Sequence, residues 1–208
     1  MFTGITRGVF PVASAQKKGT LLTYAVTLPA EMIEGLQIGA SVSIDGVCQT
    51  VVRVDGNDVV FEAIEETLKL TTLGALSQGD LVTAERSFRV GDEIGGHEVS
   101  GHVIGKGRIH DIKEDDGSYD LRVAVPATWM KYIQRKGFIA IDGSSLTVGQ
   151  TEICDDEGLF WLHLIPETLR LTKLGKKAVG DYVNIELDAR TVTIVDTVER
   201  VLAERLST

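Results

Sequence analysis

Short apolar runs rich in β-branched residues recur along most of this chain, and turn sequences containing glycine, aspartate and asparagine separate them. In the first half these runs cover residues 40–44, 50–54, 59–62 and 81–86. Such runs are typical of strands, and strands at this spacing indicate an all-β sandwich or barrel. We expect a six-stranded barrel of Greek-key type, because closure removes the exposed edges of a sheet.

The pattern of the first half returns in the second half. Residues 44–51, IDGVCQTV, reappear at 141–148 as IDGSSLTV, a shift of 141 − 44 = 97. Residues 66–71, ETLKLT, reappear at 167–172 as ETLRLT, a shift of 167 − 66 = 101, so the stretch between the blocks has grown by four residues. This self-similarity indicates a duplicated domain, since solenoids and propellers repeat at shorter periods and at least three times.

The duplication predicts an all-β chain of two tandem six-stranded barrels followed by a C-terminal helix. The expected bounds are residues 1–90, 91–189 and 190–208. The terminal segment has apolar side chains at helical spacings, at Ile194, Val195, Val198, Val201, Leu202 and Leu206. Both barrels are complete without this helix, so we favour oligomerisation over docking on its own chain. Each copy also predicts one short helix that starts at a proline, over residues 29–36 and 126–134.

Charge and composition narrow the class of partner. The 208 residues have a formal net charge of −9, and the isoelectric point is near 4.9. A nucleic acid or an anionic membrane surface normally selects a basic protein, so neither is an expected partner. The chain has no uninterrupted apolar run long enough for a membrane span and no signal-peptide pattern, and its two cysteines lie at different positions of the repeat. We therefore expect a reduced, cytoplasmic protein.

The two copies share a frame of hydrogen-bonding residues and differ in their ionisable residues. Thr50 matches Thr147, and Thr67 matches Thr168. The unequal pairs are Ile5 with His102, Gly39 with Lys136, Cys48 with Ser145 and Ser87 with Asp188. Two similar pockets with different polar groups could each bind one molecule of the same small ligand and make the two bound molecules react differently. The alternatives are a structural histidine, a buried cysteine, and a solvated lysine and aspartate.

Residues 95–102, GGHEVSGH, form the densest local signal in the chain. A metal site is not expected, because the two histidines are five residues apart, whereas helical zinc sites place them four apart. On a strand this odd separation would point them to opposite faces. The glycines allow a close approach of the backbone to a ligand or a neighbouring strand.

Together with MFTGI at the N-terminus, KG at 136–137, DGSSLT at 142–147 and IPETL at 165–169, this motif resembles the riboflavin synthase alpha-chain family. The resemblance covers the chain from Met1 to the terminal helix. It implies two six-stranded barrels, a homotrimer held by the C-terminal helices, and a site between barrels of two subunits. It also implies a transferase without metal or cofactor. The implied reaction converts two molecules of 6,7-dimethyl-8-ribityllumazine into riboflavin and 5-amino-6-ribitylamino-uracil.

The same resemblance assigns site residues. The pocket of the N-terminal barrel is expected to use Gly4, Ile5, Thr6, Cys48, Gln49, Thr50, Glu62, Ala63, Ile64, Glu65, Glu66 and Thr67. The C-terminal pocket is expected to use Gly101, His102, Val103, Lys136, Ser145, Leu146, Thr147, Ile165, Pro166, Glu167, Thr168, Leu169 and Arg170. The expected catalytic residues are His102, Ser145, Cys48, Asp188 and Thr147. His102 and Ser145 lead for proton transfer, since an imidazole titrates near neutral pH.

Two residues depart from the family pattern. Gln49 and Ser144 stand where apolar residues are expected, and both flank residues expected to contact the ligand. They would alter binding unless the alternation of a strand points their side chains away from the ligand. The alternative to an enzyme is a lumazine protein, a fluorescent antenna with one chromophore in the N-terminal barrel. Lumazine proteins resemble this chain less around the second pocket, so retention of SGH at 100–102 and SLT at 145–147 favours the enzyme.

Overall fold

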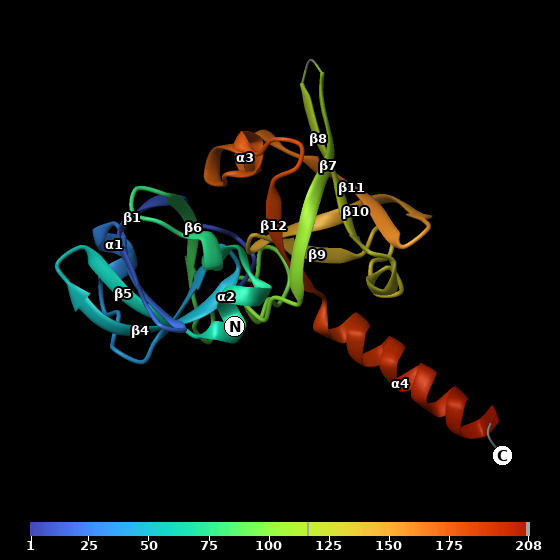
Figure 1. Cartoon of the computed structure of the whole chain (residues 1–208), viewed down its shortest axis with the longest axis horizontal. Helices are drawn as coiled ribbons and strands as arrows, with labels where there is room; N and C mark the ends of the chain where they lie inside the picture. Colours follow the sequence, from blue (N-terminus) through green and yellow to red (C-terminus); the bar gives the residue numbers. More distant parts are fainter. Residues whose placement is uncertain (116, 207–208) are drawn as a thin grey trace.

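The protein is described by a computed structural model over residues 1–115 and 117–206. Within these residues twelve strands form two closed antiparallel barrels, as predicted (Figure 1). Barrel 1 has the order β1-β2-β5-β4-β3-β6, with β1 (Val9–Lys18), β2 (Leu21–Thr27), β3 (Ser41–Ile44), β4 (Val47–Asp55), β5 (Asp58–Ala63) and β6 (Leu81–Arg86). Barrel 2 has the order β7-β8-β11-β10-β9-β12, with β7 (Gly105–Asp115), β8 (Ser118–Pro126), β9 (Phe138–Ile141), β10 (Ser144–Cys154), β11 (Glu157–Leu164) and β12 (Tyr182–Leu187).

The four added residues lie in one hairpin of barrel 2. In barrel 1, Val51 pairs with Phe61 across β4 and β5, a separation of 61 − 51 = 10 residues. The equivalent pair in barrel 2, Val148 with Leu162, is separated by 162 − 148 = 14 residues. The insertion lengthens the β10–β11 hairpin and leaves the rest of the barrel in register.

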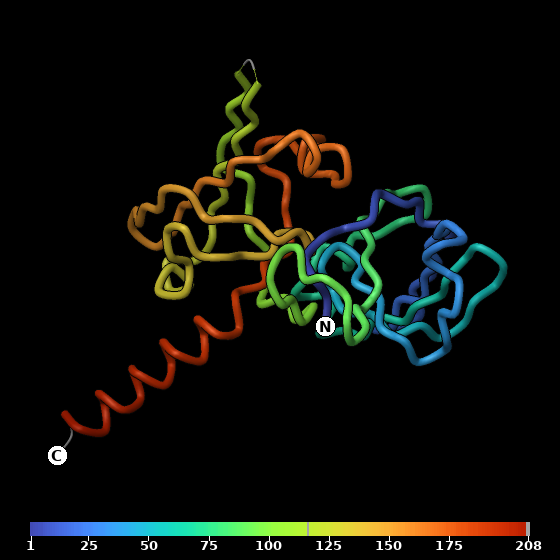
Figure 2. The backbone as a smooth tube through the Cα atoms, turned by 180° about the vertical axis from the view of Figure 1, so that it is seen from behind, coloured from blue at the N-terminus to red at the C-terminus, as the bar shows by residue number. Residues whose placement is uncertain are grey.

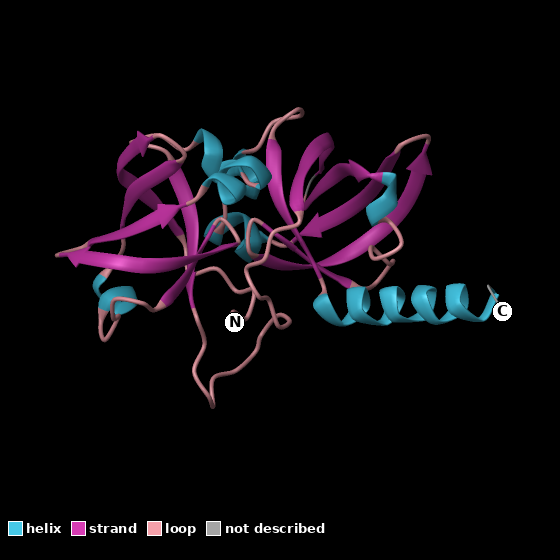
Figure 3. Cartoon of the chain, turned by 60° about the horizontal axis from the view of Figure 1, so that its bottom comes forward, coloured by secondary structure: helices cyan, strands magenta, loops and turns pink. Residues whose placement is uncertain are grey.

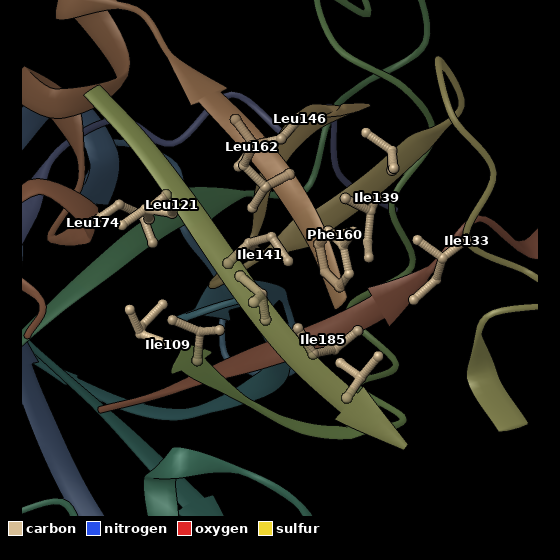
Figure 4. Close-up of a cluster of buried hydrophobic side chains, with 14 of the residues drawn as sticks. Ile109, Leu121, Ile133, Ile139, Ile141, Leu146, Phe160, Leu162, Leu174 and Ile185 are labelled. Atoms are coloured by element: carbon tan, nitrogen blue, oxygen red, sulfur yellow. The ribbon is translucent and has the colours of Figure 1, made fainter. Parts of the chain in front are cut away.

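Each barrel encloses its own apolar core. Barrel 2 is filled by side chains that converge from all around the sheet, including Ile109, Leu121, Ile139, Phe160 and Ile185 (Figure 4). Barrel 1 has an equivalent core around Tyr24 and Phe61, whose rings are 5.5 Å apart. Because side chains alternate along a strand, every second residue faces the core and the residues between them face outward.

The helical segments are short except for the last. They are α1 (Ala30–Ile33), α2 (Glu65–Leu70), α3 (Pro166–Leu171), the 3-10 turns η1 (Thr72–Ala75), η2 (Ala127–Trp129) and η3 (Leu174–Lys176), and α4 (Ala189–Leu206). The predicted helices over 29–36 and 126–134 are wrong in length. The first is the single turn α1, and Gly35 follows it at φ +65°. In the second copy, hydrogen bonds from Met130 to Ala127, Tyr132 to Trp129 and Ile133 to Met130 make successive three-residue turns instead of an α-helix.

The terminal helix α4 extends away from barrel 2, as Figures 1 and 3 both show. No described helix has the length and apolar character needed to span a bilayer. The N-terminus lies between the two barrels (Figure 2).

The barrels meet through reciprocal contacts, which gives the junction an approximate twofold symmetry. The Thr83 hydroxyl donates to the Asp142 carbonyl, and the equivalent Asn184 amide donates to the Asp45 carbonyl. At the centre, Gly46 and Gly143 touch so closely that a Cβ on Gly46 would lie 2.4 Å from the Gly143 nitrogen. Only glycine fits there, so the two DG turns that mark the repeat in the sequence also form the contact between its copies.

Candidate functional site

Two segments outside the barrels cross each other at the junction. We call residues 1–7 and 96–104 the crossing segments. They pair through Phe2 and Val99, whose backbones exchange hydrogen bonds of 2.7 and 2.9 Å. Both side chains are buried and pack against Ala140 and Cys48, one from each barrel. The crossing segments therefore hold the two barrels to one another.

Each crossing segment lies against the barrel of the other copy. The Ser145 amide of barrel 2 donates to the Gly4 carbonyl at 2.8 Å, and the Cys48 amide of barrel 1 donates to the Gly101 carbonyl at 2.9 Å. We expected Gly4–Thr6 to serve the pocket of barrel 1 and Gly101–Val103 that of barrel 2. The structure instead places Gly4 beside Ser145 of barrel 2 and Gly101 beside Cys48 of barrel 1. Both glycines have positive φ, and a Cβ on either would lie 2.6 Å from the Cβ of Ser145 or Cys48.

Two buried glutamates fix the crossing segments. Glu85 accepts hydrogen bonds from the Thr3 amide, the Thr3 hydroxyl and the Gly4 amide, at 2.7, 2.6 and 3.1 Å. Glu186, at 186 − 85 = 101, accepts the same three from Ser100 and Gly101, at 2.7, 2.7 and 2.9 Å. Burial raises the pKa of the Glu85 carboxyl, and the hydrogen bonds from Thr3 and Gly4 oppose this. Each glutamate thus lies on a strand of one barrel and binds the crossing segment that contacts the other barrel.

Ser145 has a histidine partner, but it is His97. The His97 Nδ1 atom lies 2.7 Å from the Ser145 hydroxyl oxygen, and the imidazole stacks on Phe138 with ring centroids 5.1 Å apart. Burial lowers the pKa of His97, which the charge of Asp188 opposes. At neutral pH the imidazole is therefore mainly uncharged, so it can accept a proton from the hydroxyl or return one to it.

His102 lies with barrel 1 instead. Its neighbour Gly101 contacts Cys48, and its amide donates to the Ser100 hydroxyl at 3.2 Å, while the side chain is exposed. Among the described residues no hydrogen bond joins His102 to Ser145. The two expected proton-transfer residues are thus placed at different barrels, His102 near half-buried Cys48 and Ser145 beside His97.

Further outward-facing residues lie beside Cys48 on barrel 1 and beside Ser145 on barrel 2. Thr50 and Thr147 are exposed on β4 and β10, beside Cys48 and Ser145 respectively. Lys136 is exposed with φ +69°, and its amide donates to the Val148 carbonyl just as Gly39 donates to Val51. A lysine in a conformation that the other copy gives to glycine is strained, and such strain persists mainly at functional positions.

The alternation of the strands accounts for Gln49 and Ser144. Both side chains are buried inside their barrels, on the face opposite to Cys48 and Ser145. Gln49 accepts a hydrogen bond from the Tyr24 hydroxyl at 3.1 Å and donates to the Cys48 carbonyl at 2.9 Å. These two departures from the family pattern therefore change the cores and not the outward-facing groups.

The other expected site residues also divide into buried side chains and side chains that solvent can reach. The side chains of Ala63 and Leu146 are buried in the two cores. Around helices α2 and α3 lie the exposed residues Glu62, Ile64, Glu65, Glu66, Ile165, Pro166, Glu167 and Arg170 and the half-buried residues Thr67, Thr168 and Leu169. Within the crossing segments Thr6 is buried, whereas Ile5 is exposed and Val103 half-buried.

Asp188 serves as the cap of α4. Its carboxylate accepts hydrogen bonds from the Thr191 amide at 2.9 Å and the Thr191 hydroxyl at 2.6 Å. Burial alone would raise the pKa of Asp188, but these bonds and nearby His97 lower it. Its charge is thus available to the imidazole at neutral pH, without a direct hydrogen bond.

Sequence reasoning missed three residues of this arrangement. His97 has no counterpart in the first copy, because 97 − 97 = 0 lies before Met1, so the overlay could not flag it. Glu85 and Glu186 do stand at the shift of 101, and this signal could have identified them. Their importance depends on the crossing segments, which the repeat alone does not reveal.

The comparisons with known proteins agree with this architecture. The chain matches the lumazine binding domain family model twice, over residues 3–87 and 100–188. It is 47% identical to the riboflavin synthase of Escherichia coli strain K12 over 206 residues, which cover 99% of this chain and 95% of that protein. It is 41% identical to the riboflavin synthase of Chlamydia pneumoniae, with 98% of each chain covered.

Solved structures show the same fold. The crystal structure of LumP complexed with riboflavin superposes with a TM-score of 0.80 at 26% identity, covering 90% of this chain and all of that one. LumP complexed with 6,7-dimethyl-8-(1'-D-ribityl) lumazine gives a TM-score of 0.78 at 25% identity, covering 90% and 99%. The repeat, the two barrels and these full-length similarities establish that the chain belongs to the riboflavin synthase family.

Proposed function

We propose that the protein is a riboflavin synthase that transfers a four-carbon unit between two molecules of 6,7-dimethyl-8-ribityllumazine. The products are riboflavin and 5-amino-6-ribitylamino-uracil. Together the two products contain all the atoms of the two substrates, so the overall reaction needs no external oxidant. It needs two identical molecules to react differently.

The observation that supports this proposal is that the two barrels have the same backbone hydrogen bonds at equivalent positions but different polar side chains beside them. Barrel 1 offers Cys48 beside Gly101, and barrel 2 offers Ser145 beside Gly4 and His97. The shared hydrogen-bonding frame suits one ligand bound twice. The different nucleophilic and basic groups suit one ligand that loses a proton and another whose ring accepts a nucleophile. Juxtaposition of the bound molecules would supply much of the acceleration.

The residues take proposed roles from their surroundings. The His97–Ser145 pair would move the proton of the 7-methyl group at barrel 2, since the imidazole is held uncharged and its plane is fixed by Phe138. Cys48 and His102 would act at barrel 1, and Lys136 and Thr147 would bind at barrel 2. Asp188 would favour the protonated imidazole by its charge. Loss of one proton-transfer group typically slows an enzyme by about 10²–10⁴-fold.

The reacting pair would form between two chains of a homotrimer. Support comes from α4, which exposes Ile194, Val198 and Leu202. Barrel 2 contacts the start of this helix through Val192 and its later turns through polar pairs, in which Lys131 and Tyr132 bond Glu199 and Asp196. An apolar stripe left open in this way suits self-association. Sedimentation of the full chain tests the expected mass.

A chromophore-binding antenna is less well supported. It needs one site, and the residues of barrel 2 would then have no reason to be strained at Lys136 or paired at His97 and Ser145. For either function, enzyme or antenna, we propose a location in the cytoplasm.

The test is incubation of the purified chain with 6,7-dimethyl-8-ribityllumazine while riboflavin is followed by absorbance. One mole of riboflavin should form per two moles of lumazine. Ser145→Ala, His97→Gln and Cys48→Ala should each slow it at least about 100-fold. Cys154→Ala is the matched control, because that cysteine is exposed at the far end of β10. Lumazine binding without riboflavin would instead identify an antenna.

A further inference from the structure

The core of barrel 1 contains a hydrogen-bonded polar pair, and barrel 2 has leucine at both of the equivalent positions. The Tyr24 hydroxyl donates to the side-chain oxygen of Gln49 at 3.1 Å, and both residues are buried. At the shift of 97 their counterparts are Leu121 and Leu146, which are also buried. The two cores thus differ by a concerted exchange of two polar residues for two apolar ones.

The pairing of the strands confirms that the positions are equivalent. Tyr24 pairs with Phe61 across β2 and β5, and Leu121 pairs with Leu162 across β8 and β11, where 162 − 61 = 101. Replacement of both partners of a buried hydrogen bond by apolar groups is often nearly neutral for stability. The barrel fold therefore does not require the polar pair, and barrel 1 has it for another reason.

The Gln49 amide connects this pair to Cys48 on the outer face of the barrel. Its nitrogen donates to the Cys48 carbonyl at 2.9 Å. The Cys48 amide in turn donates to the Gly101 carbonyl of the second crossing segment, also at 2.9 Å. Residue 48 is thus bonded from both sides, from the core and from the crossing segment. The Ser145 amide of barrel 2 makes the matching backbone bond, but the side chain of Leu146 has no donor to offer the Ser145 carbonyl.

Tyr24 fixes the direction in which the Gln49 amide donates. Burial, and after it the charge of Asp45, raises the pKa of the Tyr24 hydroxyl well above its ordinary value, so this hydroxyl stays protonated. The Cys48 carbonyl can only accept, and the Tyr24 hydroxyl donates. A single orientation of the amide satisfies both, with its oxygen toward Tyr24 and its nitrogen toward Cys48.

We propose that Tyr24 and Gln49 are positioning residues, which hold Cys48 from inside barrel 1 so that its thiol has one orientation toward the ligand. This role rests on the proposed function, in which Cys48 acts on lumazine at barrel 1. Neither residue touches the ligand, because both side chains face the core. Misplacement of a reacting group lowers the rate of reaction, so these residues should affect kcat more than KM.

A double-mutant cycle on riboflavin formation tests this role. Gln49→Leu, which introduces the residue of barrel 2, should lower kcat about fivefold and change KM less than about twofold, because one hydrogen bond to Cys48 is lost. In a Cys48→Ala chain the same substitution should have no further effect, because no thiol remains to be positioned. An equal loss in the two backgrounds would overturn the inference.

Further variants separate positioning from stability. Gln49→Leu leaves the Tyr24 hydroxyl buried without its acceptor, so it also lowers the urea midpoint. Tyr24→Phe/Gln49→Leu removes that hydroxyl and should recover the midpoint, whereas the loss in kcat should persist because the Cys48 carbonyl still lacks its donor. Leu28→Val is the matched control, since it trims the same core to the residue that barrel 2 has at Val125 and keeps both hydrogen bonds. A kcat that follows the midpoint across these variants would show that the pair is only structural.

Hydrogen exchange gives a readout that does not depend on turnover. The Cys48 and Ser145 amides donate to equivalent glycines, so the ratio of their exchange rates in one sample is an internal measure of how firmly residue 48 is held. Gln49→Leu and Tyr24→Phe/Gln49→Leu should both raise this ratio about fivefold, and Leu28→Val should not. An unchanged ratio refutes the positioning role whether or not riboflavin forms. A raised ratio in a chain whose parent forms no riboflavin refutes only the proposed function.

Discussion

Removal of the Lys173 charge should weaken the contact between the two barrels, so that they no longer unfold together. The Lys173 ammonium reaches from barrel 2 to the Asp45 carboxylate of barrel 1 at 2.6 Å and to the Leu81 carbonyl at 2.7 Å. Burial alone would lower the pKa of Lys173, but the charges of Asp45 and Asp142 outweigh it and raise that pKa. Lys173→Met keeps most of the aliphatic stem and leaves Asp45 charged without a cation.

The magnitude follows from burial. The Asp45 side chain is 3% exposed and that of Lys173 is 17% exposed. Loss of one partner of a buried ion pair costs about 3–5 kcal/mol. Because Lys173 is partly solvated, we expect the lower end, about 3 kcal/mol. With a urea dependence of about 2 kcal/mol per M, the midpoint should fall by about 1.5 M.

The assay is urea unfolding followed by two signals. Both tryptophans, Trp129 and Trp161, belong to barrel 2, so their fluorescence reports that barrel, whereas far-UV circular dichroism reports both. The two transitions should coincide in the parent chain and separate in Lys173→Met.

Lys177→Met is the matched control. Lys177 has the same exposed fraction, but it lies 3.7 Å from Asp142 and forms no hydrogen bond to it. Its effect should be clearly smaller. Addition of Asp45→Asn to Lys173→Met should recover part of the loss, because residue 45 then has no charge that needs a cation. A midpoint shift below about 0.5 M for Lys173→Met, or equal shifts for the two lysines, would refute the reasoning.

Two further perturbations address the junction. Burial and the charge of Asp45 raise the pKa of Asp142 to about 6, against 3.8 for the free side chain. Between these values the folded chain binds more protons than the unfolded chain, so this group's stabilising contribution is lost as pH rises from about 4 to 6. The midpoint of Asp142→Asn relative to the parent should therefore increase with pH across this window, and a constant difference would contradict the assignment. Glu186→Gln should destabilise the chain by about 2 kcal/mol, since one amide oxygen cannot replace two carboxylate oxygens that accept three hydrogen bonds. In the same urea assay the exposed control Glu157→Gln should change little, and equal losses would argue against a specific role for Glu186.

The sequence by itself determined the architecture of each domain. Apolar runs and DG turns indicated four strands in the first half, and the repeat showed that the second half has the same pattern, so two all-β domains with two cores follow from local chemistry. The first two strands of barrel 1, β1 and β2, were not among these runs. Strand alternation offered the possibility that Gln49 and Ser144 face away from the ligand, and the structure shows both side chains buried inside their barrels. Helices α2 and α3 were not predicted, because six residues are too few for a helical periodicity to be visible.

Tertiary structure alone decided which residues meet. Gly4 and Gly101 belong to their own copies in sequence, yet their carbonyls accept hydrogen bonds from the opposite barrels at Ser145 and Cys48. In the same segment as Gly101, His97 stays with barrel 2, so it is His97, and not His102, that lies beside Ser145. The physical reason is that periodicity records which way a side chain faces relative to its own strand. The partners of an unpaired segment depend on contacts between residues far apart in the sequence, here from 145 − 97 = 48 to 145 − 4 = 141 positions, which no local pattern records.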